Sequence, residues 1–245
     1  MKTKIYSIVM IIAVVLALST HVVLAAESTG PQAMVGKVAV NLVVPEGLSR
    51  VDGRNAKADA YIKSLEPKFK LTVLAVYAVP AEWNKFVAAA SSGKPATIPR
   101  YAMICVPSKM PKKNYSNQAA RREFKRYANW FSAAANNRPL AALLTSQGNK
   151  KLKEYMGVDI GFQFKTGDNT KKIAETSNSI SLGAEVDFNV FGQPSKVYLT
   201  ATSLQVADKL IFLAYFENRD SKDILEIQSR AIAWRTLMSG ANPGR

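Results

Sequence analysis

The sequence predicts an α+β fold, in which a largely antiparallel sheet is flanked by helices as a layered α/β/α sandwich. Two observations support this prediction. Four strand-like segments follow one another without an intervening helix, near 158–165, 179–191, 196–206 and 209–217. Segments with helical spacing of apolar residues lie before this group and after it. Because successive hairpins build antiparallel sheets, the helices are expected to cover the apolar faces of that sheet.

The N-terminal part of the chain alternates between strands and helices. Strands are expected over residues 37–44, 69–79 and 101–106, and helices over residues 55–65, 82–90, 117–135 and 140–156. Turn residues support two of the strand ends, because Pro45-Glu-Gly47 follows the first strand and Pro80 follows the second. The sequence has no internal repeat, low-complexity tract or linker. We therefore expect residues 36–245 to form a single domain with a helical insertion near 114–156.

A last helix is predicted near the C-terminus. Asp220 or Ser221 is its expected N-cap, and Gly240 is its expected end. The apolar stripe of this helix consists of Ile224, Ile227, Ala231, Trp234 and Met238. Upstream of it, Gly192-Gln-Pro-Ser195 predicts a turn between two of the C-terminal strands.

Residues 1–25 have the pattern of an export signal. Two lysines form a basic head, an apolar core without charge reaches Leu18, and Val23 and Ala25 are the small residues that signal peptidase requires. We expect cleavage after Ala25, a flexible leader over residues 26–35, and a protein that works in the periplasm or is secreted. The alternative is a retained anchor, but the apolar core is shorter than the roughly 20 residues of a spanning helix.

The charge balance is strongly basic. The full chain has 33 Lys and Arg against 18 Asp and Glu; loss of the signal removes two lysines, which leaves 31 against 18, a net charge of +13. A field of this sign attracts phospholipid headgroups, lipopolysaccharide or an acidic protein. Export makes nucleic acid the least expected of the anionic partners. A solubilising role for the charge alone stays open.

Histidine and cysteine counts exclude several chemistries. The one histidine, His21, lies within the export signal, so the mature protein has no Ser-His or Cys-His pair and no His-ligated metal. The sequence contains no motif that binds a cofactor or a metal, so we expect the protein to hold neither. The one cysteine, Cys105, lies in an apolar run that predicts a buried strand, where a thiol usually acts as a small apolar group. A redox role or an intermolecular disulfide stays open.

The helix predicted over residues 117–135 has two distinct faces. At 100° per residue, Phe124, Tyr127, Trp130 and Phe131 gather on one side. Basic residues gather on the other side, and with two lysines of the preceding loop they form a candidate surface for an anionic partner: Arg121, Arg122, Lys125, Arg126, Lys112 and Lys113. The alternative is an ordinary amphipathic helix with its aromatic side chains in the core and its charges in water.

Glu185 and Asp187 are the carboxylate pair considered for catalysis. They lie on one face of a predicted strand, about 7 Å apart by the rise of a strand, which is comparable to the acid and base of glycosidases. Val186, Phe188 and Val190 alternate with them and form the opposite face. The pair is then most simply the solvent side of a half-buried strand.

The C-terminal pattern resembles the end of the PsbP-like fold. The resemblance is carried by the strands at 197–206 and 209–217, by Trp234-Arg-Thr-Leu237 and Ala241-Asn242 in the last helix, and by Val43-Val-Pro-Glu-Gly47 after the first strand. It covers residues 36–242 in outline, and the helical segment at 114–156 departs from the simplest form of that fold. The chain is also similar to small exported proteins of Gram-negative bacteria. Because PsbP-like proteins serve mainly as accessory modules, the resemblance implies a role without catalysis.

Three functions are consistent with these observations. The leading one is a binding or accessory module without enzymatic activity, exported to the periplasm or cell envelope. The second is a peripheral protein that binds anionic lipid or lipopolysaccharide at the envelope surface and has no integral membrane segment after signal cleavage. The third, and least favoured, is a glycan hydrolase that depends on carboxylates.

Overall fold

The computed structural model describes residues 32–54, 71–91, 98–108, 113–135, 146, 150, 163–165, 170–190, 193–219 and 223–243. Several predicted features lie wholly or mostly outside these ranges, among them the export signal over residues 1–25, the helix at 55–65, all of the helix at 140–156 except residues 146 and 150, and Lys112.

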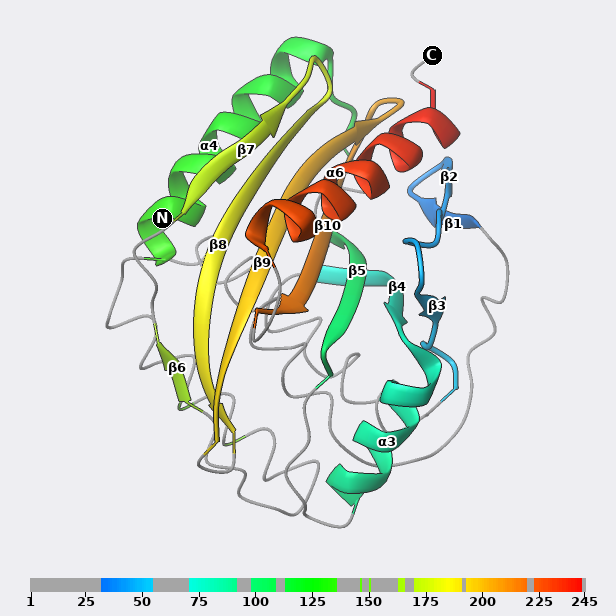
Figure 1. The fold of residues 1–245 in the computed structure, drawn as a ribbon. Coiled ribbons are helices and arrows are strands. Elements are labelled where there is room, and N and C mark those ends of the chain that lie inside the picture. The colour runs from blue at the N-terminus through cyan, green and yellow to red at the C-terminus, as the bar shows by residue number, and fades with distance from the viewer. Residues whose placement is uncertain are drawn as a thin grey trace.

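Eight of the described strands form one sheet, in the order β3-β4-β5-β10-β9-β8-β6, with β7 also paired to β8 (Figure 1). Their bounds are β3 (Ser49–Arg50), β4 (Leu71–Ala78), β5 (Arg100–Pro107), β6 (Gln163–Lys165), β7 (Lys171–Glu175), β8 (Ser179–Val190), β9 (Gln193–Val206) and β10 (Lys209–Asn218). Each of these pairings is antiparallel, so the predicted antiparallel sheet is confirmed. The expected meander is present as β6, β8, β9 and β10, which are neighbours in that order.

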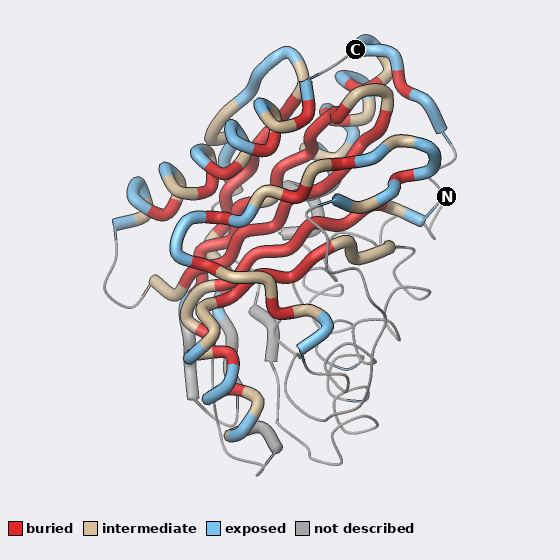
Figure 2. Tube along the Cα trace, turned by 90° about the vertical axis from the view of Figure 1, so that its right-hand side faces the viewer, coloured by how far each residue is buried: buried red, intermediate tan, exposed pale blue. Residues whose placement is uncertain are grey.

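Two helices cover opposite faces of the sheet, α4 (Asn117–Ala135) and α6 (Ile224–Ala241), and α3 (Pro80–Ser91) connects β4 to β5 (Figure 1). Side chains along a strand alternate between its two faces. On β10, Leu213 and Tyr215 join the apolar cluster under α6, whereas Phe212 packs edge-on against Tyr127 of α4 with ring centroids 4.8 Å apart. The buried strands therefore lie between two helical layers, as Figure 2 shows, and the predicted α/β/α sandwich is confirmed.

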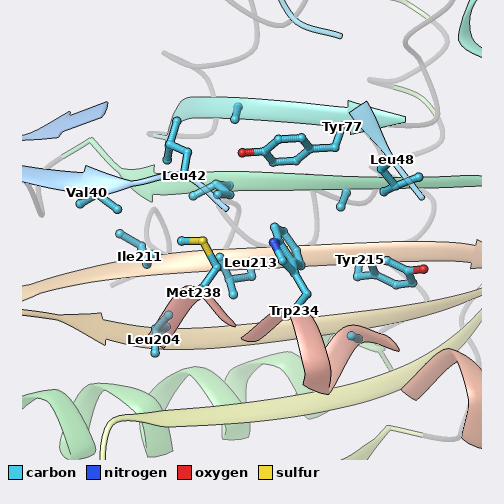
Figure 3. Packing of buried hydrophobic residues seen from close by; sticks show 14 of the residues in the cluster. Val40, Leu42, Leu48, Tyr77, Leu204, Ile211, Leu213, Tyr215, Trp234 and Met238 are labelled. Carbon is cyan, nitrogen blue, oxygen red and sulfur yellow. The ribbon is translucent and has the colours of Figure 1, made fainter. Parts of the chain in front are cut away.

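The core under α6 is built around Trp234, which is 2% exposed. Its ring meets Tyr77 edge-on at 6.1 Å, and its indole N–H donates to the carbonyl of Val43 at 2.8 Å (Figure 3). The predicted apolar stripe is confirmed, because four of its members are buried: Ile227, Ala231, Trp234 and Met238. An aromatic side chain in such a position contributes about 3–5 kcal/mol relative to alanine. This stripe fixes the last helix onto the sheet.

Strand β5 is buried on both faces, as its continuous apolar run predicts. Cys105 is fully buried and its thiol is free, in agreement with its interpretation as a small apolar residue. Burial raises the pKa of the Cys105 thiol to about 12, because a thiolate would lose its hydration there. The thiol is therefore protonated and unreactive in the folded protein at neutral pH.

A separate two-stranded sheet precedes the main one, and it consists of β1 (Gln32–Val35) and β2 (Val38–Asn41). The prediction of a flexible leader over residues 26–35 is wrong for residues 32–35, because all four pair with β2 and Val35 is fully buried. Residues 26–31 lie outside the description. Four residues are too few to show the alternation that separates a strand from a polar leader.

Three other boundaries differ from the predictions. The N-cap of α6 is Asp223, whose carboxylate accepts from the N–H of Leu225 at 3.0 Å, and the helix continues through Gly240 to Ala241. Strand β9 starts at Gln193, within the predicted turn, because its first residues pair with β8. Two short strands, β3 and β7, are not predicted at all. Among the described helices, none combines the length and the apolar composition that a membrane-spanning segment needs.

Candidate functional site

The inner face of α4 attaches the helix to the sheet. Ala120 is fully buried and Phe124 is 4% exposed, four residues apart on one side of the helix. Tyr127, one turn further on, reaches Phe212 of β10. The side chains of Trp130 and Phe131, predicted to lie on the same side, are outside the description. The aromatic half of the prediction is therefore confirmed where the structure describes it.

The outer face of α4 carries four basic side chains, and all four are exposed: Arg121, Arg122, Lys125 and Arg126. We call these four residues the α4 basic face. Their spacing of one and four residues places them within about 140° of the helix circumference, opposite Ala120. The helix contains one acidic residue, Glu123, so its net charge is +3. The structure thus brings the four predicted helix residues together on one surface.

The four residues of the α4 basic face differ in their contacts with neighbouring residues. Arg121 donates from Nε to the carbonyl of Ser177, in the turn between β7 and β8, at 3.3 Å. Arg126 forms an ion pair with Glu123. In the described part of the structure Arg122 and Lys125 have no ion pair, so their charges are the ones most available to a partner.

Strand β7 extends the positive surface beside α4. Lys171 and Lys172 are exposed on this strand. Lys172 donates to Glu175 at 2.7 Å; this hydrogen bond and the charge of Lys172 lower the pKa of that carboxyl, and the charges of Lys125 and Arg121 lower it further. The influence of Lys125 and Arg121 on Glu175 shows that α4 and β7 share one electrostatic surface. Sequence reasoning missed the two β7 lysines because it did not predict the strand that carries them.

The loop lysines have different outcomes. Lys113 is exposed just before α4, and its carbonyl accepts from the buried Nζ of Lys209 at 3.0 Å. This bond anchors the loop to β10, but no described contact joins the Lys113 side chain to the α4 basic face. Lys112 lies outside the description, so its predicted place on this surface is not described.

The carboxylate pair of β8 does not form an isolated acid and base. Glu185 is partly buried and forms an ion pair with Arg219, while Asp187 is exposed and lies opposite Lys196 of β9. Val186, between them, is buried on the other face, as the alternation predicts. Each carboxylate therefore has a basic residue beside it. Within the described ranges, no three His, Cys, Asp or Glu side chains are close enough to hold a metal ion.

A fully buried acidic residue lies under α6, and the sequence analysis did not single it out. Glu217 is 1% exposed and accepts two hydrogen bonds from Arg230, at 3.1 Å from Nε and 3.0 Å from Nη2. The hydroxyl of Tyr215 donates to the same carboxylate at 3.0 Å. Burial lowers the pKa of Arg230, but its hydrogen bond with Glu226 and the charge of Glu217 outweigh this and raise it. This arrangement ties α6 to β10 and is a structural ion pair.

No protein-family model matches the chain, and no curated protein matches it. The candidate surface therefore rests on the geometry of α4 and β7 alone.

Proposed function

We propose that this protein is a binding or accessory module without enzymatic activity, which acts in the periplasm or cell envelope and docks on an anionic partner protein through the α4 basic face. The observation that carries this proposal is the exposure of all four basic side chains on one side of α4. The inner face of the same helix is held by Ala120 and Phe124, so the surface is presented on a fixed element. Rigid presentation lowers the entropy cost of binding.

Charge supports the choice of an anionic partner. The chain carries a net charge of +15, and Lys171 and Lys172 of β7 add two exposed basic side chains to the four of the α4 basic face. Such a surface speeds association with an acidic partner and loses strength as salt rises, because the Debye length is only about 8 Å at 0.15 M.

The arrangement of the carboxylates favours binding over catalysis. Glu185, the better placed of the two β8 carboxylates, is already bound by Arg219. A general acid in a glycosidase instead has a carboxyl group that is free to donate its proton to the glycosidic oxygen. The resemblance of the sequence to the PsbP-like fold, whose members serve mainly as accessory modules, supports the same choice.

The alternative function is adsorption to anionic lipid or lipopolysaccharide at the envelope surface. The same exposed cations favour it, at about 1 kcal/mol for each Lys or Arg near a charged membrane. Salt should weaken lipid adsorption more than binding to a protein partner, because a protein partner adds packed contacts that salt does not screen.

A double charge reversal tests the proposal. Arg122→Glu with Lys125→Glu changes the net charge by −4 without touching Arg121 or Arg126, which have structural contacts. The matched control reverses two exposed basic residues elsewhere, Arg54→Glu with Lys85→Glu. Each purified protein is mixed with cell envelopes of the organism that produces it and crosslinked to the envelope components that it contacts. It is then recovered with its crosslinked partners after washes at low and high salt.

The proposal expects one envelope protein to be recovered in fixed ratio with wild type and with the control, and to be lost with the α4 variant. Sedimentation with vesicles of neutral lipid, and of neutral lipid containing 30% anionic lipid, tests the alternative. Adsorption to the anionic vesicles alone, removed by salt, would favour the lipid function. Equal recovery of the same partner with the α4 variant and the control would refute the role of the α4 basic face.

A further inference from the structure

The outer face of α6 carries few charges for a surface helix of so basic a protein. Glu226 is the one charged residue among the exposed positions of this helix. The other exposed positions hold leucine or small uncharged residues: Leu225, Ser229, Ala233, Thr236, Leu237 and Gly240. A surface helix normally places charged residues opposite its buried stripe. The outer face of α6 therefore has the composition of a contact surface.

Four of these exposed positions, spaced by four residues, form a ridge along the helix: Leu225, Ser229, Ala233 and Leu237. We call these four residues the α6 ridge. The leucines at its two ends are 66% and 54% exposed, respectively. Small side chains occupy the two central positions. The order of sizes is therefore large, small, small, large, and it is the same in both directions along the chain.

The other large apolar residues that are exposed in the described structure lie in the same layer. They are Met34 of β1, at 62%, and Val44, at 46%. The hairpin of β1 and β2 lies beside the C-terminal end of α6 (Figure 1). Val44 follows Val43, whose carbonyl accepts from Trp234 of α6. Among the described residues, no large apolar side chain is exposed on the α4 side of the sheet, so the α6 layer is the apolar side of the molecule.

The α6 layer is also electrically neutral. Residues 32–48 and 223–243 contain three basic and three acidic side chains: Lys37, Arg230, Arg235, Glu46, Asp223 and Glu226. Their charges sum to zero, whereas the whole chain carries +15. Charges further away than about 8 Å are largely screened at 0.15 M salt. At this layer no local excess of positive charge opposes the approach of a second copy, and none attracts an anionic partner.

We propose that the α6 ridge is the contact of a twofold dimer, in which α6 of one copy packs against α6 of a second copy in the opposite chain direction. A twofold interface uses the same surface on both partners, so that surface has to match itself. The α6 ridge does so, because its two ends are alike in size and its two central residues are small. With the ridges of the two helices side by side, Leu225 of each copy meets Leu237 of the other. Ser229 and Ala233 then allow a close approach at the centre.

The dimer leaves the α4 basic face available. Helices α4 and α6 cover opposite faces of the sheet (Figure 1). Two copies joined through α6 therefore carry their α4 basic faces on the two outer sides of the assembly. The contact is apolar and does not use the α4 cations, so this inference does not rest on the function proposed above.

Ala233→Glu tests the centre of the α6 ridge. It places a charged side chain in the contact of both copies, while glutamate is a good helix former and position 233 is exposed, so the fold should be kept. Ala88→Glu makes the same substitution at an exposed position of α3 and is the matched control. Sedimentation velocity of purified wild type and both variants, from about 1 µM to about 1 mM at 0.15 M salt, measures the Kd of the dimer.

The proposal expects wild type and Ala88→Glu to dimerise with equal Kd, and Ala233→Glu to dimerise at least tenfold more weakly. The double reversal on α4, Arg122→Glu with Lys125→Glu, should leave the Kd of the dimer unchanged or lower it. A wild type that stays monomeric over the whole range, or an Ala233→Glu variant that dimerises as wild type does, would overturn the proposal. Monomeric wild type that binds vesicles of neutral lipid, and loses this binding with Ala233→Glu, would assign the α6 ridge to a lipid surface instead.

Disulfide formation tests the direction of the two helices without relying on Ala233→Glu. Chains with Leu225→Cys are mixed with chains with Leu237→Cys and mildly oxidised; Cys105 is fully buried and does not compete. In the antiparallel pair, residue 225 lies about 18 Å along the helix axis from its own equivalent, but beside residue 237 of the other copy. Disulfides should therefore join unlike chains. Disulfides that join like chains equally well would contradict the proposed arrangement.

Discussion

Replacement of Arg230 by methionine is the sharpest test of how α6 is held on the sheet. Arg230 contacts two carboxylates of very different exposure: the Glu217 side chain is 1% exposed and that of Glu226 is 58% exposed. Methionine fills similar volume and removes the charge and the hydrogen bonds. The perturbation therefore takes a bidentate guanidinium away from a buried carboxylate.

The expected cost follows from that burial. Removing one partner of a buried ion pair typically costs about 3–5 kcal/mol, because the remaining charge has lost its compensation. Tyr215 still donates to Glu217 in the variant, so we expect a loss near the lower limit, about 3 kcal/mol. For a chain of this size, that loss lowers Tm by roughly 6–12 °C.

Denaturant unfolding followed by circular dichroism measures this loss. Glu226→Gln is the matched control, because it removes only the exposed partner of the same Arg230, and such pairs contribute about 0–1 kcal/mol. Arg230→Met combined with Glu217→Met should recover much of the stability, since an apolar pair replaces the buried ions. A loss below about 1 kcal/mol for Arg230→Met, indistinguishable from that of Glu226→Gln, would refute the reasoning.

Three further predictions concern single positions. Ala207 has a φ of 51°, so Ala207→Gly should relieve strain and raise the free energy of unfolding by about 0.5 kcal/mol. The control, Ala233→Gly on the exposed side of α6, should lower the free energy of unfolding by about 1 kcal/mol, and a lower Tm for Ala207→Gly would contradict the prediction. Asn242→Ala should cost about 2–3 kcal/mol and speed hydrogen exchange at the Asn41 amide, and an unchanged exchange rate there would show that the cap does not hold β2. Cys105 should resist iodoacetamide at pH 8 until the protein unfolds, and rapid alkylation of the folded protein would disprove its burial. Because burial raises the pKa of its thiol from 9.0 to about 12, the contribution of this thiol to the free energy of unfolding should be complete below pH 9 and should fall as the pH rises from 9 to 12.

The elements with strong periodicity were predictable from the residues alone. Strand β5 agrees with the prediction because its apolar run is uninterrupted, and the apolar stripe of α6 agrees because the helix is long enough to repeat its spacing several times. Strands β1 and β3 contain four and two residues, too few to show any period. Asp223 was missed as the N-cap because Asp220 and Ser221 are equally good caps in sequence, and only the path of the chain distinguishes them.

The candidate sites were predictable to different degrees. The α4 basic face follows from a helical wheel, since it needs only residues one and four positions apart. The exposed lysines of β7 do not, because the strand that carries them is defined by its pairing with β8. The bond between Asn242 and the backbone of Asn41 joins residues 201 positions apart, and the burial of Glu217 depends on how α6 packs back onto β10.

The sequence by itself determined the class of fold, the charge and the absence of histidine from the chain after residue 21, because these depend on composition and on local periodicity. Only the tertiary structure decided which polar groups are paired. Asn242 bonds to the backbone of Asn41, and Arg230 neutralises Glu217. Both outcomes depend on where the C-terminal helix comes to rest against the hairpin and the sheet. Long-range packing of apolar side chains sets that position, and no local pattern in the chain encodes it.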